Sequence, residues 1–130
     1  MVITCHQIAQ VGDELAALGD EPSQRSAVSR HFYAAFHRCV QWKDALPGTA
    51  SIGGYSGGSH QTLLNQLRGP DRLCSDAQKK RSRFLAVKLA ALRTRRVVAD
   101  YELGDTLLPG EVNTQQFQAA TILADCDANP

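Results

Sequence analysis

The sequence predicts an all-α fold: one bundle of four to five helices, with a glycine-rich loop between the second and third helices. Two observations predict this class. Apolar residues recur at spacings of three and four along most of the chain, and the alternation typical of strands is scarce. The chain has 130 residues, of which 43% are hydrophobic and 21% charged, a size and composition typical of one folded domain. We therefore expect a single domain over residues 1–130.

The first expected helix covers about residues 4–18. Gly19 follows it, at a position where helices commonly end. A second helix is expected to start near Pro22, since proline is tolerated in a first turn, and to run to about Lys43. The predicted apolar stripe of the first helix consists of Ile8, Val11, Leu15 and Leu18.

The second helix is predicted to have two different faces. They lie about 200° apart on the helix, so one can enter the core while the other stays polar. The predicted core stripe consists of Val28, Phe32, Ala35 and Cys39. The polar or amphipathic stripe consists of Ser26, Arg30, Tyr33 and His37.

The remaining elements follow from turn and cap residues. Residues 47–59 contain five glycines and are expected to form a loop. A short helix is expected over about residues 60–67. The sequence Ser-Asp-Ala-Gln at 75–78 reads as a capping box that opens the longest helix, about residues 75–103. A further cap at Asn113 predicts a last helix of about 12 residues.

The formal net charge of +1 conceals two blocks of opposite sign. Residues 79–96 carry eight cations and no acid, whereas residues 100–130 carry six acids and no base. Within the basic block, Arg81, Lys88 and Arg95 repeat every seven residues and share one helix stripe. Such a stripe suits a phosphate backbone, but it also suits solvent or a pairing with the acidic C-terminal third. The sequence leaves these alternatives open.

The four cysteines contain no C-x-x-C pair and are expected to be free, mostly buried thiols. The histidines and cysteines lack metal-ligand spacing, so we expect no metal site and no cofactor. No apolar run approaches the roughly 20 residues of a membrane span. The N-terminus lacks the pattern of a secretory signal, and a cytoplasmic location is the expectation.

Two motifs together resemble the HEPN family, the higher-eukaryote and prokaryote nucleotide-binding domains. Residues 29–37 read Ser-Arg-His-Phe-Tyr-Ala-Ala-Phe-His, similar to the family pattern Ser-Arg-x-Tyr-Tyr-Ala-x-Phe-His. Residues 96–101 read Arg-Val-Val-Ala-Asp-Tyr, similar to Arg-x-x-Ala-Asp-Tyr. His60 lies after the glycine-rich loop, where relatives often have a histidine. The resemblance spans about residues 25–103.

The resemblance implies a helical bundle, usually a homodimer with its functional cleft along the dimer seam. Many members are metal-independent ribonucleases of toxin–antitoxin, CRISPR-linked or phage-defence systems. Their signature is an arginine, four to six residues, and a histidine that takes part in proton transfer. Here Asp100, not histidine, follows Arg95 at that spacing, and no histidine occurs after His60. Binding is therefore favoured over self-sufficient catalysis.

These considerations define three groups of candidate site residues. The first is a polar network in which Asp100 pairs with Arg30 or Arg96; its motif residues are Ser26, His60, Asp100 and Tyr101. The candidate catalytic residues are Arg30, Tyr33 and His37. Of these, Arg30 and His37 have the spacing of the family signature. The candidate RNA or phosphate ligands are Arg81, Arg83, Lys88, Arg93, Arg95 and Arg96.

The favoured function is an RNA- or nucleotide-binding protein of a prokaryotic toxin–antitoxin or phage-defence system. One alternative is a metal-independent endoribonuclease toxin that uses Arg30 and His37 at a dimer seam. Another is a non-catalytic partner subunit that docks on an acidic protein such as a nucleotidyltransferase. The expected partners are RNA or a nucleotide, a second copy of the chain, and a protein encoded in the same operon.

Overall fold

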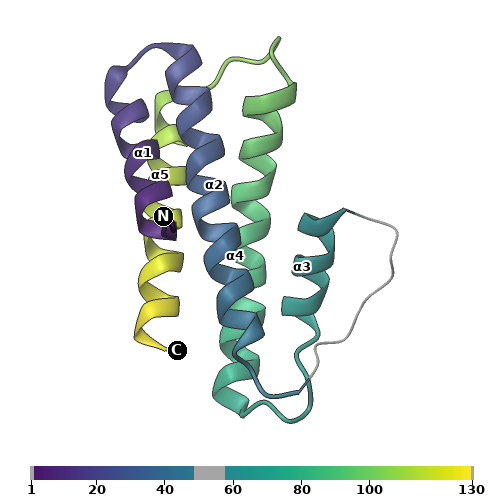
Figure 1. Cartoon of the computed structure of the whole chain (residues 1–130). Coiled ribbons are helices and arrows are strands. Elements are labelled where there is room, and N and C mark those ends of the chain that lie inside the picture. The colour runs from purple at the N-terminus through teal and green to yellow at the C-terminus, as the bar shows by residue number, and fades with distance from the viewer. Residues whose placement is uncertain (1, 49–57, 130) are drawn as a thin grey trace.

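The computed structural model describes residues 2–48 and 58–129, and these residues form five α-helices and no strand. The helices are α1 (Cys5–Leu18), α2 (Glu21–Asp44), α3 (Ser59–Arg68), α4 (Asp76–Tyr101) and α5 (Pro109–Ala128). Figure 1 shows the short α3 beside α4, on the side of the bundle away from α1 and α5. The prediction of an all-α bundle is confirmed. Most of the predicted glycine-rich loop, residues 49–57, lies outside the described residues.

α1 begins at a capping box and ends at Gly19, which has a left-handed φ of 82°. Its predicted apolar stripe was wrong at two of four positions: Ile8 and Leu15 are half-buried, but Val11 and Leu18 are exposed. Cys5 and Gly12 are buried instead. The physical reason is that the ring of His31 on α2 lies directly against Gly12. A Cβ added to Gly12 would lie 2.7 Å from Cδ2 of the His31 ring, so the glycine face of α1 is the one that can approach α2. The aliphatic residues at 11 and 18 are therefore turned outward.

His31 is itself buried, with a relative exposure of 1%. Its Nε2 lies 2.8 Å from Oδ1 of Asp13 on α1, and its Nδ1 has no partner within the described part of the chain. Because a carboxylate accepts hydrogen bonds, the arrangement fits an imidazole that donates from Nε2. This bond ties α1 to α2.

α2 starts where Oδ2 of Asp20 accepts a hydrogen bond from the backbone N–H of Ser23 at 3.0 Å. It contacts each of the other four helices. The core stripe predicted for this helix, Val28, Phe32, Ala35 and Cys39, is fully buried. On the predicted polar stripe, Ser26, Arg30 and His37 are exposed and Tyr33 is half-buried. Both predicted faces of α2 are thus confirmed.

α4 begins at the predicted capping box of Ser75 and ends at Tyr101. The start predicted for the last helix was wrong, because α5 begins at Pro109 and has 20 residues. Proline fits a first helical turn, where its missing N–H has no intrahelical partner to lose. The hydroxyl of Thr114 donates to the carbonyl of Gly110 at 2.8 Å, so this residue bonds back within α5 and does not cap a new helix.

The main core lies where α2, α4 and α5 meet, and α3 adds three leucines to it. Its members come from all four helices: Phe32, Phe36, Leu63, Leu64, Leu67, Leu85, Leu89, Leu92 and Ile122 are among them. Burying each of these side chains stabilises the fold by about 1.5–3 kcal/mol before the entropic cost is subtracted. The same packing fixes the rotation of α2 and α4 relative to each other. That rotation decides which polar residues share a surface.

Gln115 of α5 is a fully buried polar side chain between these helices. Its Nε2 donates to the carbonyl of Val28 on α2 at 3.2 Å and to that of Leu92 on α4 at 3.0 Å. Its Oε1 accepts a hydrogen bond from Nη1 of Arg95 at 3.0 Å. One side chain therefore connects three helices through satisfied hydrogen bonds.

We expect Gln115→Ala to lower the free energy of unfolding by about 2–4 kcal/mol, because it opens a cavity and removes three hydrogen bonds. Chemical denaturation followed by circular dichroism measures the change. The matched control is Gln41→Ala at an exposed position of α2, which we expect to shift the same quantity by less than about 0.5 kcal/mol. Equal effects of the two variants would contradict the structural role of Gln115.

Candidate functional site

The two sequence motifs meet where α2 packs against α4. Arg96 Nε donates to Asp100 Oδ2 at 2.8 Å, one helical turn away. Ser29 Oγ of α2 donates to the same carboxylate oxygen at 3.2 Å. Arg96 and Asp100 have side-chain exposures of 11% and 27%, so the pair is partly buried. Of the two partners that the sequence left open for Asp100, Arg96 is the one that forms the ion pair.

Arg96 also organises two tyrosines. Its Nη2 donates to the hydroxyl of Tyr33 at 3.0 Å and to that of Tyr101 at 3.3 Å. Its Cζ lies 5.4 Å from the centroid of the Tyr33 ring and 5.2 Å from that of Tyr101, within the range of cation–π attraction. The arginine thus holds two aromatic side chains from different helices in fixed positions.

Arg30 extends this cluster toward solvent. Its Cζ lies 5.3 Å from the centroid of the Tyr33 ring, and the side chain is exposed. Within residues 2–48 and 58–129 it makes no ion pair. Its positive charge is therefore available to a ligand.

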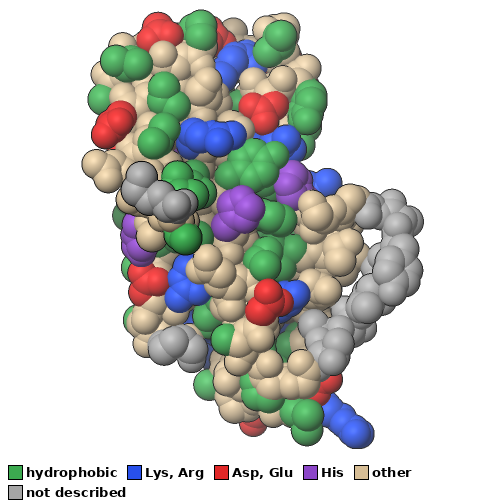
Figure 2. Space-filling view, viewed as in Figure 1, with side chains coloured by type: hydrophobic (Ala, Val, Ile, Leu, Met, Phe, Trp, Pro, Cys, Tyr) green, Lys and Arg blue, Asp and Glu red, His purple; other side chains and the backbone are tan. Residues whose placement is uncertain are grey.

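Two histidines border the tyrosine. The ring of His60, at the start of α3, packs edge-on against Phe36, Phe32 and Tyr33, with centroids 4.8, 5.1 and 5.6 Å away. The exposed His37 packs against Phe36 at 5.3 Å and Tyr33 at 6.3 Å. Figure 2 shows histidine side chains on one face of the molecule, with hydrophobic and basic side chains around them.

His60 is the histidine whose protonation is most clearly perturbed. Burial lowers its pKa from the ordinary value, and the positive charges of Arg96, Arg93 and His37 lower it further. At neutral pH the ring is therefore predominantly uncharged and able to accept a proton.

Arg93 completes the group from α4. Its Nη1 donates to Oε1 of Gln61 on α3 at 2.8 Å. Arg93 and Arg96 are three residues apart and therefore lie on the same side of α4. We call the whole surface the α2–α4 site; it consists of Ser29, Arg30, Tyr33, His37, His60, Arg93, Arg96, Asp100 and Tyr101. Its three arginines face one carboxylate, so it is cationic.

The other predicted phosphate ligands lie elsewhere. Nζ of Lys88 is 3.4 Å from Oδ2 of Asp125, and Nη1 of Arg95 donates to the side-chain oxygens of Gln115 and Gln118 on α5. Lys88 and Arg95 therefore face α5. Arg81 and Arg83 lie in the first half of α4, beside an exposed pocket next to Phe84. The structure divides the basic block between separate surfaces of α4.

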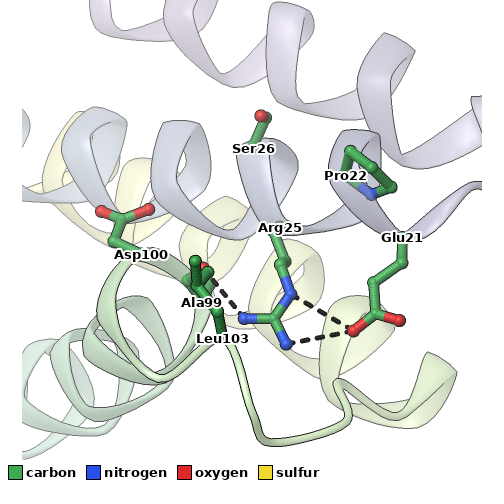
Figure 3. A pocket seen from close by; sticks show the side chains of 7 residues that line it. All are labelled: Glu21, Pro22, Arg25, Ser26, Ala99, Asp100 and Leu103. Atoms are coloured by element: carbon green, nitrogen blue, oxygen red, sulfur yellow. Dashed lines mark hydrogen bonds and ion pairs between the residues drawn. The ribbon is translucent and has the colours of Figure 1, made fainter.

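An open pocket of ≈550 Å³ adjoins the α2–α4 site at Asp100 and Ser26 (Figure 3). Arg25 occupies its floor. Its Nη1 donates to the carbonyls of Val98 and Ala99, both at 3.1 Å, and its Nη2 forms an ion pair with Glu21 at 3.0 Å. Arg25 has the family spacing to His31 in the sequence but was not among the predicted site residues. Its contacts satisfy the last carbonyls of α4, so it holds the end of the helix that carries Asp100 and Tyr101.

Sequence reasoning identified most of the α2–α4 site but missed two contributors. Ser29 belongs to the matched motif and lies one helical turn before Tyr33, so the two side chains share one side of α2. This shared side could have marked Ser29 as a neighbour of Asp100, to which it donates a hydrogen bond. Phe36 also belongs to the motif, and its role in packing both histidines depends on the position of α3.

The described residues contain no group of three or more histidine, cysteine, aspartate or glutamate side chains placed to hold an ion. All four cysteines are buried free thiols. Among the helices of the described chain, none is long and apolar enough to cross a membrane.

No family model, curated protein or solved structure matches the chain.

The perturbed histidine gives a pH-dependent stability. Because the pKa of His60 is lower in the folded protein, the unfolded chain binds a proton first as the pH falls below about 6.5. We expect the free energy of unfolding to decrease between pH 7 and pH 5, and less so in His60→Phe, which keeps an aromatic ring without a titrating group. Urea denaturation across this range measures both slopes. Between pH 7.5 and 8.5 the free energy of unfolding should change with pH in the same way in the two proteins. Identical slopes below pH 6.5 would contradict the shift.

Proposed function

We propose that the α2–α4 site binds RNA, and that the protein is a HEPN-like RNA-binding protein of a prokaryotic toxin–antitoxin or phage-defence system. The observation that carries the proposal is the gathering of Arg30 and Arg96 around Tyr33, with Arg93 acting electrostatically on the neighbouring His60 and a single carboxylate, Asp100, opposite. The resemblance of both motifs to the HEPN family supports RNA as the ligand class.

The arginines have different parts in this proposal. Arg30 is exposed and makes no ion pair within the described residues, so it can meet a phosphate directly. Arg93 uses Nη1 for Gln61 and can offer its other N–H groups to the same strand. Arg96 is a positioning residue, since Asp100, Tyr33 and Tyr101 engage its Nε and Nη2.

Aromatic side chains add to the affinity for RNA that the arginines provide. Tyr101 is 68% exposed, and its hydroxyl is held by Arg96, so its ring is presented to solvent in a fixed orientation. Stacking of a base on such a ring contributes about 1–3 kcal/mol and tolerates any sequence. Because Arg30, His37 and Tyr101 are all exposed, the site is an open surface that suits a single strand better than a small enclosed nucleotide.

We expect Arg30→Ala combined with Arg93→Ala to weaken binding of a labelled single-stranded RNA by about tenfold or more, since each lost phosphate contact is worth roughly 1 kcal/mol. The dependence of log K on log salt concentration should become less steep. Fluorescence anisotropy measures both quantities. Arg72→Ala, at an exposed position outside the site, is the matched control and should leave them unchanged. Unaltered affinity and salt dependence in the double variant would refute RNA binding at this site.

Metal-independent cleavage of RNA is the second candidate function, and the lowered pKa of His60 favours it. A neutral imidazole can take the proton of a 2′-hydroxyl while that oxygen attacks phosphorus and the bond to the 5′-oxygen breaks. The departing 5′-oxygen then takes a proton from a second group, for which His37 is suited. The products would be a 2′,3′-cyclic phosphate and a 5′-hydroxyl.

Arg30 and His37 alone are poorly placed to share one phosphate. They are seven residues apart on α2, which corresponds to about 10 Å along the helix axis. A site at the seam of a homodimer, as the resemblance implies, could combine Arg30 of one copy with His37 of the other. Cleavage would then depend on the dimer, whereas binding by a single α2–α4 site would not.

For this second function we expect a labelled RNA to be cut in the presence of EDTA, and His37→Ala and His60→Ala each to slow cleavage by about 100-fold. His6→Ala, an exposed histidine of α1 outside the site, is the control. Gel analysis of the products and their cyclic phosphate ends provides the measurement. RNA that stays intact with and without divalent metal would rule out cleavage while leaving the binding proposal in place.

A further inference from the structure

We propose that the exposed face of α4 around Phe84 is a docking surface for an acidic amphipathic helix of a partner protein. The inference does not depend on the proposed RNA site, because it uses a different part of α4. We call this surface the Phe84 surface; it consists of Ala77, Lys80, Arg81, Arg83, Phe84 and Val87.

The Phe84 surface exposes apolar side chains to solvent. Phe84 is 52% exposed and Val87 is 71% exposed, and both line an open pocket of ≈680 Å³. Ala77 precedes Phe84 by seven residues and Val87 follows it by three, so the three side chains form one stripe along α4. Contiguous apolar stripes on an exposed helix are typical of protein interaction sites.

Cations surround this stripe. Lys80, Arg81 and Arg83 line the same pocket and make no ion pair within the described residues. The acid that borders the pocket, Asp125, is already paired with Lys88 at 3.4 Å. Lys80 and Arg81 lie between Ala77 and Phe84 on this face, so the surface combines exposed apolar side chains with positive charge. An acidic amphipathic helix presents the complementary pattern.

The surface continues from α4 onto α5. Nζ of Lys88 lies 4.1 Å from the centroid of the Phe84 ring, and Lys88 also lines a second pocket of ≈370 Å³ together with Phe117 of α5. Phe117 is 73% exposed. A helix lying along α4 and α5 would thus cover both aromatic side chains and bring its acids near Lys88 and the three unpaired cations.

Charge and shape argue against the other occupants. A second copy docked symmetrically through this face would bring the same cations against one another, which is unfavourable. RNA would satisfy the cations but would leave Val87 and Ala77 without an apolar partner.

The test uses a synthetic helical peptide of about 18 residues, with leucine at positions i, i+3, i+4 and i+7 and glutamate at most others. We expect it to bind the full chain with a Kd of about 100 μM or lower, and a scrambled peptide of the same composition to bind at least about tenfold more weakly. Isothermal titration calorimetry measures both. Absence of binding by the first peptide, or equal binding by the two, would overturn the proposal.

Substitutions on the Phe84 surface test whether the peptide binds there. We expect Phe84→Ala to weaken binding by about tenfold, as for a central interface residue, and Arg81→Glu with Arg83→Glu to abolish it. Arg81→Lys with Arg83→Lys should retain most of the affinity. Leu18→Ala, a similarly exposed apolar residue on α1, is the matched control and should have no effect. Unchanged circular dichroism spectra ensure that each variant is folded.

Two further measurements test whether RNA or a second copy of the chain occupies the Phe84 surface instead. If Phe84→Ala weakens binding of single-stranded RNA as strongly as binding of the peptide, the surface belongs to RNA and the proposal is wrong. If sedimentation shows a dimer that Phe84→Ala dissociates, a second copy covers the surface and the proposal is again wrong. We expect Phe84→Ala to leave both RNA affinity and oligomeric state unchanged.

Discussion

Every other helix packs against α2, and this single constraint determines where the functional side chains can lie. The residues Val28, Phe32 and Cys39 must face the core, because each has a relative exposure of 1% or less. The helical period then leaves one polar stripe, with Arg30, Tyr33 and His37 on it. α4 contributes Arg96 and α3 contributes His60 to the border of that stripe. The α2–α4 site is thus a consequence of how the core is packed.

Periodicity in the sequence was sufficient to predict both faces of α2 and the helices apart from the start of α5, since a buried stripe at spacings of three and four has one simple explanation. It failed at Val11 and Leu18 of α1, because the burial of Gly12 depends on the His31 ring of another helix. For the site, motif spacing identified Asp100 and its two possible partners. The pairing of Asp100 with Arg96 is a local contact between residues four apart on α4. The hydrogen bond from Ser29 depends on the packing of α4 on α2, which no local pattern records.

The basic block illustrates the same limit. Adjacent positions on a helix are about 100° apart, so Arg95 and Arg96 must face different neighbours. Arg95 bonds to Gln115 and Gln118 of α5, whereas Arg96 bonds to Tyr33 of α2. The cations that α5 does not engage form two surfaces with different aromatic and apolar surroundings. Tyrosines and histidines suit a nucleic acid strand, whereas Phe84 and Val87 suit an apolar protein face, so one helix can serve two kinds of ligand.

Asp100 limits what the α2–α4 site can do chemically. In the family that the motifs resemble, a histidine would be expected near this position; here a carboxylate accepts hydrogen bonds from Arg96 and Ser29. Arg96 is therefore partly neutralised before any ligand arrives, and a phosphate would gain less from it than from Arg30. The carboxylate would also repel an incoming phosphate if Arg96 did not hold it. If the site binds RNA as proposed, recognition depends on Arg30, Arg93 and the tyrosines, with His37 and His60 left as the groups that could move protons. This division of roles favours binding over cleavage.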